Sequence, residues 1–232
     1  MVAYGAALSG RARPLVLAAI AAALFCALAL GVETNRVAGF DAAVRGEVHS
    51  LASPFLTLVA EKVTWLGTLG VIALFGVLAV AVLMHAGRRD GAVMLTATMV
   101  GAVALENGLK FSFRRERPPP FFGPEPLTYS FPSGHALFSL CFYGALAIAL
   151  ARSVQSGVVK TAIWIPAVLL VLAIGASRIY LGLHYPSDVL GGYLVAIAWI
   201  AIVLSADQRL GPSVGRQCSG NRRRRARRDG DE

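Results

Sequence analysis

Six long apolar runs decide what this chain can fold into. They cover residues 14–32, 66–84, 91–109, 136–151, 159–176 and 189–205. A helix needs roughly 20 apolar residues to cross a hydrocarbon core about 30 Å thick. The runs therefore predict an all-α, polytopic membrane protein, built as a bundle of six transmembrane helices.

The composition supports this interpretation. Only 15% of the 232 residues are charged, whereas soluble domains usually carry about 25%. The first run is long for a signal peptide and no clear cleavage site follows it, so we expect it to be retained. We expect residues 1–206 to form one membrane domain and residues 207–232, which are polar and rich in Gly and Arg, to form a basic, disordered tail.

The formal charge of +9 is concentrated in that tail. Residues 221–228 read NRRRRARR and hold six of the 22 basic residues, so 22 − 6 = 16 basic residues remain against 13 acidic ones. Nucleic-acid binding is one interpretation of such a run. On a membrane protein, a topology signal that lies on anionic headgroups is the simpler one. We expect membrane lipids, and no nucleic acid, as partners.

Six spans place both termini on one side of the membrane. The basic residues that flank the spans on that side are Arg11, Arg13, Arg88, Arg89, Arg152, Lys160 and the tail. The positive-inside rule makes this side cytoplasmic, in a multi-pass protein of the cell (cytoplasmic or inner) membrane. On the opposite side, residues 33–54 are too polar to span and suit a short amphipathic helix along the membrane face. The loop after the third run is basic against the rule, and phosphate binding would explain it.

Three polar segments adjoin the outer ends of the spans and can meet at one depth. They are residues 110–118, 132–135 and 177–188. Phosphate hydrolysis needs fixed cations and N–H donors around the phosphoryl oxygens. Lys110, Arg117 and Arg178 are candidate cations. Ser133 and the Gly134 amide are candidate donors at a helix N-terminus, where Ser133 is also expected to cap the helix.

Two histidines and one carboxylate complete the candidate site. His184 is a candidate for in-line attack on phosphorus, and Asp188 is close enough in sequence to hold its other ring nitrogen. His135 can give a proton to the leaving oxygen. No acidic cluster is available to hold a metal, and the three cysteines form neither a disulfide framework nor a zinc site, so we expect no metal and no cofactor.

Simpler interpretations exist for single residues. Lys110 pairs with Glu106 one turn earlier, His184 is an interfacial histidine, or Asp188 is only a favourable charge at a helix start. The residues between Lys110 and Arg117, namely Arg114, Arg115 and Glu116, are interpreted as the solvated face of their loop. Together the simpler interpretations would require coincidences at eight positions.

The three segments resemble the signature of the type-2 phosphatidic acid phosphatase superfamily: K-x6-R-P, P-S-G-H and S-R-x5-H-x3-D, with every fixed position present between Lys110 and Asp188. The resemblance implies a six-helix membrane fold with its site at the outer membrane–water boundary, and a phosphohistidine intermediate on His184. It implies that His135 is the acid and base and that Asp188 supports the nucleophile. The phosphate-binding residues that it implies are Lys110, Arg117, Ser133, Gly134 and Arg178.

The leading hypothesis is therefore a metal-independent phosphatase that acts on a lipid phosphate or diphosphate. Undecaprenyl diphosphate, phosphatidylglycerophosphate and phosphatidic acid are candidate substrates, and the outward site and small size favour a polyprenyl diphosphate. Vanadate-dependent haloperoxidases resemble the same signature, although the membrane spans argue against that class. A non-catalytic transporter or scaffold is the third alternative. The sequence leaves the oligomeric state open.

Overall fold

The computed structural model describes residues 2–124 and 126–210, and within them every regular element is a helix. The prediction of an all-α fold is thus confirmed for this part of the chain. The tail predicted to be disordered lies outside the described residues from 211 onward. In order, the elements are α1 (Val2–Glu33), α2 (Ala38–Ser50), α3 (Pro54–Trp65), α4 (Leu69–His85), α5 (Arg89–Phe113), α6 (Gly134–Ser139), the π-helix η1 (Leu140–Gly144), α7 (Ala145–Ala151), α8 (Gly157–Tyr180) and α9 (Pro186–Leu210).

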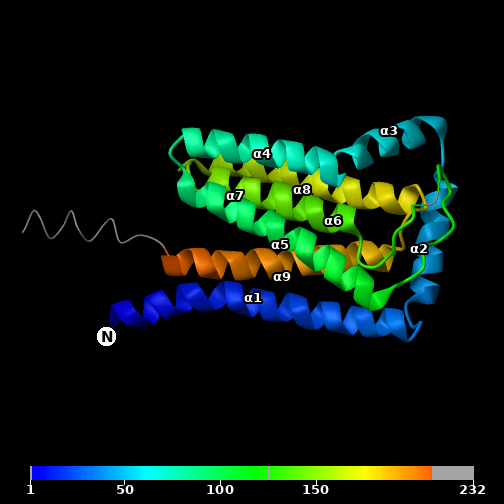
Figure 1. Cartoon of the computed structure of the whole chain (residues 1–232), viewed down its shortest axis with the longest axis horizontal. Coiled ribbons are helices and arrows are strands. Elements are labelled where there is room, and N and C mark those ends of the chain that lie inside the picture. The colour runs from blue at the N-terminus through cyan, green and yellow to red at the C-terminus, as the bar shows by residue number, and fades with distance from the viewer. Residues whose placement is uncertain (1, 125, 211–232) are drawn as a thin grey trace, which may run out of the picture.

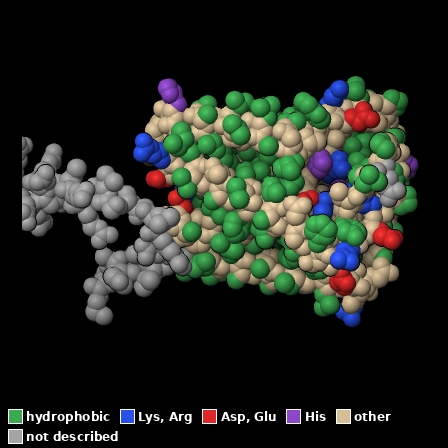
Figure 2. Space-filling view, viewed as in Figure 1, with side chains coloured by type: hydrophobic (Ala, Val, Ile, Leu, Met, Phe, Trp, Pro, Cys, Tyr) green, Lys and Arg blue, Asp and Glu red, His purple; other side chains and the backbone are tan. Residues whose placement is uncertain are grey.

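Five of the six expected spans are long, apolar helices. Within the described residues they are Ala12–Glu33, Arg89–Phe113, Gly134–Ala151, Gly157–Tyr180 and Pro186–Asp207. Figure 1 shows these helices side by side, with α1 lying along α9. Figure 2 shows charged side chains gathered mostly at the two ends of the bundle and hydrophobic ones between them. That distribution suits helices whose outer faces contact hydrocarbon.

The expected span at residues 66–84 is not one straight helix. α3 and α4 meet at an angle of 50°, and only together do they qualify as a sixth span. The chain turns at Gly67, which packs closely against two other elements: a Cβ there would lie 2.5 Å from Ile174 and 3.1 Å from His135. Tyr143 donates its hydroxyl to the Leu66 carbonyl, 3.0 Å away, and so satisfies a group that the break leaves without a helical partner.

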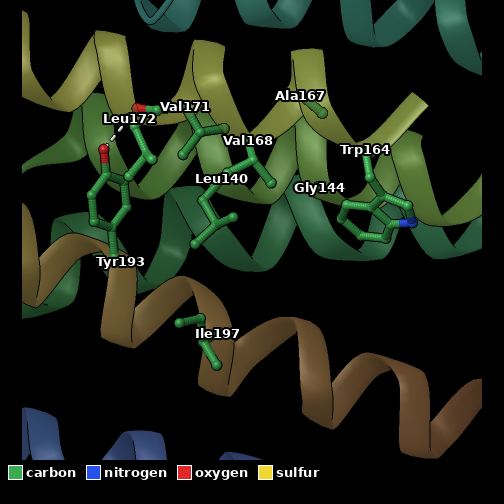
Figure 3. Close-up of a pocket in the computed structure, with 9 residues that line it drawn as sticks. All are labelled: Leu140, Gly144, Trp164, Ala167, Val168, Val171, Leu172, Tyr193 and Ile197. Atoms are coloured by element: carbon green, nitrogen blue, oxygen red, sulfur yellow. Dashed lines mark hydrogen bonds between the residues drawn. The ribbon is translucent and has the colours of Figure 1, made fainter. Parts of the chain in front are cut away.

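The core lies where α5, α9 and the helix from Gly134 to Ala151 meet. Its most buried members include Leu95, Leu137, Phe142 and Ala196. Small residues let the helices approach: a Cβ on Gly101 of α5 would lie 2.1 Å from the Trp199 ring of α9. A separate cavity of about 210 Å³ lies between η1, α8 and α9 (Figure 3), and its walls are mainly aliphatic and aromatic side chains. The Tyr193 hydroxyl in its wall already donates to the Val171 carbonyl at 2.7 Å.

The two ends of the bundle differ in content. The start of α1 and the end of α9 lie at the same end (Figure 1), where Arg152 and Asp207 form a salt bridge at 2.6 Å. At the other end, α2 crosses the bundle and contacts α8 and α9. The short helix predicted within residues 33–54 is thus confirmed. The same end receives residues 114–124 and 126–133 and the starts of α6 and α9.

Candidate active site

All eight residues predicted for the site lie at the end of the bundle that α2 crosses. Lys110 and Arg178 occupy the last turns of α5 and α8, and Asp188 lies in the first turn of α9. The others are Arg117 in the segment after α5, Ser133, Gly134 and His135 at the start of α6, and His184 in the loop before α9. The helix ends therefore bring together three segments that are far apart in the sequence.

His184 and Asp188 form the buried centre of the site. The His184 Nδ1 atom lies 3.3 Å from the Asp188 Oδ2 atom, and the two side chains are 1% and 0% exposed. Pro186 begins α9, which places Asp188 in the first turn, close to the loop that carries His184. Asp188 Oδ2 also accepts hydrogen bonds from the Tyr185 amide at 2.8 Å and from the Ser130 hydroxyl.

The tautomer of His184 follows from its two neighbours. The Arg117 Nη1 atom lies 3.1 Å from Nε2, and a guanidinium can only donate, so Nε2 accepts and Nδ1 carries the proton toward Asp188. Burial lowers the pKa of His184 to about 4, with Arg117 and Arg178 acting in the same direction and Asp188 opposing them. At neutral pH the ring is therefore uncharged, and its Nε2 lone pair faces the cations of the site.

Ser133 does not cap its helix as predicted. It occupies the position before α6, but its hydroxyl makes no capping hydrogen bond; the Oγ atom is buried and has no partner among the described residues. The backbone is fixed instead, because the Ser133 amide donates to the Asp188 carbonyl at 2.9 Å. A buried hydroxyl without a partner is unusual in folded proteins and indicates a place for a ligand atom.

Arg178 presents a second buried donor of the same kind. The residue is 6% exposed, and its Nη1 atom donates to the Thr64 hydroxyl at 2.8 Å. Its Nε atom is buried without a partner in the described part of the chain. Since a buried guanidinium that lacks an acceptor is costly, this atom favours an anion beside it.

Lys110 and Arg117 line a more open crevice of about 600 Å³ beside the site. The simple pairing of Lys110 is confirmed, because its Nζ atom lies 2.7 Å from Glu106 Oε1. Arg117 is held by the Thr128 and Leu183 carbonyls at 2.6 and 2.7 Å. This mixed crevice, the Lys110 crevice, is lined by Glu106, Asn107, Lys110, Phe111, Arg115, Glu116, Arg117 and residues 126–129.

Gly134 and His135 close the site from the α6 side. A Cβ on Gly134 would lie 2.8 Å from the Glu106 carboxylate, so a side chain at this position would push against α5. His135 lies within electrostatic range of Lys110, Arg117, Arg178 and His184. It therefore stands among the cations that surround His184.

Two charged residues that matter here were not identified from the sequence. The interpretation of Arg115 as part of a solvated face is wrong: its Nη1 atom lies 2.6 Å from Asp188 Oδ1, and its Nη2 atom lies 2.8 Å from Asp41 Oδ2. Asp41 lies on α2 and is 1% exposed. Only the polarity of residues 33–54 hinted at Asp41, and no spacing in the sequence links it to α9.

Residues 2–124 and 126–210 contain no group of three or more His, Cys, Asp or Glu side chains placed to hold a metal ion.

Known proteins are similar to this chain in sequence and in fold. Phosphatidylglycerophosphatase B of Bacillus subtilis is 28% identical over 190 residues, which cover 80% of this chain and 92% of that protein. An undecaprenyl-diphosphatase of Sulfolobus acidocaldarius is 29% identical over 164 residues, covering 68% and 70%. A crystal structure of a transmembrane PAP2-type phosphatidylglycerolphosphate phosphatase from Bacillus subtilis matches 85% of this chain and 98% of its own, with a TM-score of 0.77 and 25% identity.

The family model for the PAP2 superfamily matches residues 91–212, more than half of the chain. This stretch includes all three segments that resembled the signature of the type-2 phosphatidic acid phosphatases. Because this model matches more than half of the chain and includes every predicted site residue, the chain belongs to the PAP2 superfamily.

Proposed function

We propose that this protein is a membrane phosphatase that hydrolyses a phosphate monoester or diphosphate of a lipid through a phosphohistidine intermediate on His184. One observation carries the proposal. Two buried donors without partners among the described residues, Ser133 Oγ and Arg178 Nε, lie in the site of a buried, neutral His184. Such a site suits a phosphoryl group, which offers three acceptor oxygens and an electrophilic phosphorus.

In the first step, the phosphoryl oxygens bind the cations Lys110, Arg117 and Arg178, the Ser133 hydroxyl and the Gly134 amide. The Nε2 atom of His184 attacks phosphorus, an N–P bond forms, and the bond from phosphorus to the leaving oxygen breaks. His135 gives its proton to that oxygen. The ring of His184 gains positive charge, which the Asp188 carboxylate at Nδ1 stabilises.

In the second step, water attacks the phosphohistidine. His135 accepts a proton from the water as the new P–O bond forms, and the N–P bond breaks. Inorganic phosphate leaves, and His184 returns to its neutral form. The three cations supply the charge that the transition state needs, so the mechanism uses no metal ion.

The surroundings of the site suit a lipid. The Lys110 crevice joins charged side chains to exposed apolar ones, Phe111 and Leu127. A phosphate next to an apolar chain fits such a surface at the end of membrane-spanning helices. The named relatives act on phosphatidylglycerophosphate and undecaprenyl diphosphate, so both compounds belong in the first panel of substrates, together with phosphatidic acid.

Purified protein should release phosphate from at least one of these three lipids, and His184→Ala should abolish the release because the nucleophile is lost. His85→Ala is the matched control, since His85 is exposed at the end of α4. Phosphate release is measured with and without a chelator, and the chelator should leave the rate unchanged.

Full turnover in His184→Ala would contradict the mechanism and favour a transporter or scaffold. Loss of the rate with chelator and its recovery with magnesium would contradict the metal-free step. Halide oxidation by peroxide that requires added vanadate, without phosphate release, would support the haloperoxidase alternative.

The Ser133 hydroxyl should contribute to phosphate binding but not to stability. A hydrogen bond to a charged group contributes about 1.5–3 kcal/mol, so Ser133→Ala should lower kcat/KM roughly 10- to 100-fold. Its thermal midpoint in detergent should stay the same, since Oγ has no partner among the described residues. Ser139→Ala is the control, because Ser139 is equally buried and donates to the Ala136 carbonyl. The Ser139→Ala variant should lose stability and keep its activity. Equal kcat/KM in wild type and Ser133→Ala would contradict the assignment of the Ser133 hydroxyl to phosphate binding.

We also propose that the site faces the outside of the cell membrane and that both termini are cytoplasmic, because basic residues flank the spans at the opposite end. With Cys26, Cys141 and Cys218 replaced, Leu127→Cys should react with an impermeant thiol reagent in intact cells, since Leu127 is fully exposed beside the site. His85→Cys, also exposed but near the basic residues Arg88 and Arg89, should react only after permeabilisation. The reverse pattern of labelling would invert the topology.

A further inference from the structure

We propose that Asp41 and Arg115 are positioning residues for the nucleophile: a buried chain of charges runs from α2 through Arg115 to Asp188 and fixes the carboxylate that orients His184. The inference rests on the proposed function, because it concerns the rate at which His184 accepts the phosphoryl group. It assigns a role in the reaction to α2, which none of the three motifs includes.

The chain of charges begins at the two oxygens of Asp188. Oδ2 accepts from the Ser130 hydroxyl, the Tyr185 amide and His184 Nδ1. Oδ1 accepts from Arg115 Nη1 at 2.6 Å. With donors on both oxygens the carboxylate cannot rotate freely, so the direction in which it holds the imidazole is fixed.

Arg115 is engaged by carboxylates rather than left for substrate. Its Nη1 atom also donates to the Ser187 hydroxyl at 2.8 Å, and its Nη2 atom donates to Asp41 Oδ2 at 2.8 Å. The guanidinium lies over the Tyr185 ring, 4.0 Å from its centroid, which holds its plane. Arg178 differs, because its buried Nε atom lacks a partner among the described residues. Arg115 therefore belongs to the support of Asp188, although it lies between Lys110 and Arg117 in the sequence.

Asp41 fixes the other end of Arg115 and the start of α9 together. Its Oδ1 atom accepts from the Ser187 amide at 2.9 Å, and its Oδ2 atom accepts from the Ser187 hydroxyl at 2.6 Å. The Ser187 amide is one of the N–H groups in the first turn of α9 that have no helical partner. A side chain from α2 thus satisfies the helix start that carries Asp188.

Electrostatics explains how this chain of charges affects the reaction. The Arg115 guanidinium lies between two buried carboxylates, Asp41 and Asp188. The negative charge of Asp41 therefore offsets part of the positive potential that Arg115 produces at Asp188. Without that negative charge, Arg115 would neutralise Asp188 more fully, and Asp188 would stabilise the positive ring of phosphorylated His184 less. Loss of the carboxylate that directly holds a catalytic histidine lowers kcat roughly 10⁴-fold. Asp41 acts on that carboxylate only through Arg115, so we expect its loss to lower the rate of phosphoryl transfer to His184 about tenfold.

The test is a single-turnover experiment on Asp41→Asn and Arg115→Lys. Full-length protein in excess is mixed with the panel lipid that wild type hydrolyses fastest, carrying ³²P in its terminal phosphate, and is quenched after milliseconds to seconds. The rate constant for labelling of the protein should fall about tenfold in both variants, since Asn removes the charge and Lys removes the fork that joins the two carboxylates. Inhibition by inorganic phosphate should stay unchanged, because the phosphate-binding groups are intact.

Asp207→Asn is the control, because it breaks a salt bridge at the opposite end of the bundle and should keep the wild-type rate constant. A merely structural role for Asp41 and Arg115 would lower the amount of labelled protein or the thermal midpoint and leave the rate constant unchanged. That result in either variant overturns the inference. If Asp41→Asn yields no folded protein, Arg115→Lys decides alone. A wild type that forms no phosphorylated protein would contradict the proposed function instead.

Discussion

The hydrogen bond from His184 to Asp188 is the interaction on which the rest of the site depends. Asp188 is fully buried in the first turn of α9, and three parts of the chain converge on it. Its carboxylate accepts from Arg115 and Ser130, and its backbone carbonyl accepts from the Ser133 amide. One residue therefore joins the segment after α5, the segment before α6 and the loop before α9, and it also sets the tautomer in which His184 Nε2 carries no proton.

The membrane explains why the charged residues of the candidate site lie at one end of the bundle. Buried charges are costly in a hydrocarbon surrounding, and here they occur where helices end and unsatisfied backbone groups are available. The site combines charges that are already paired, such as Arg115 with its two carboxylates, and donors that lack a partner among the described residues, Ser133 Oγ and Arg178 Nε. The paired charges hold the geometry, and the donors without partners fit the oxygens of a phosphoryl group.

Much of this arrangement could be predicted from the sequence, because helix spans and motif spacing are local patterns. Each motif adjoins the end of an apolar run, which was enough to bring the eight site residues to one end of the bundle. The errors concern contacts that depend on tertiary packing. The bend at Gly67 lies where this residue packs against Ile174 and His135. The Ser133 hydroxyl has no partner among the described residues, and the backbone of Ser133 is held instead by its contact with α9. Asp41 meets Ser187, 146 residues away, and no periodicity could indicate this contact.

The central claim is that His184 carries the phosphoryl group, and trapping that group tests it most directly. In His135→Ala, attack on an aryl phosphate should proceed, because a nitrophenolate leaving group needs little protonation, whereas attack by water lacks its base and should slow. Rapid quenching after mixing with ³²P-labelled p-nitrophenyl phosphate should therefore trap labelled protein. The account predicts an acid-labile, base-stable label that peptide mapping places on His184. A label on any other residue, or turnover by this variant without any labelled protein, would contradict it.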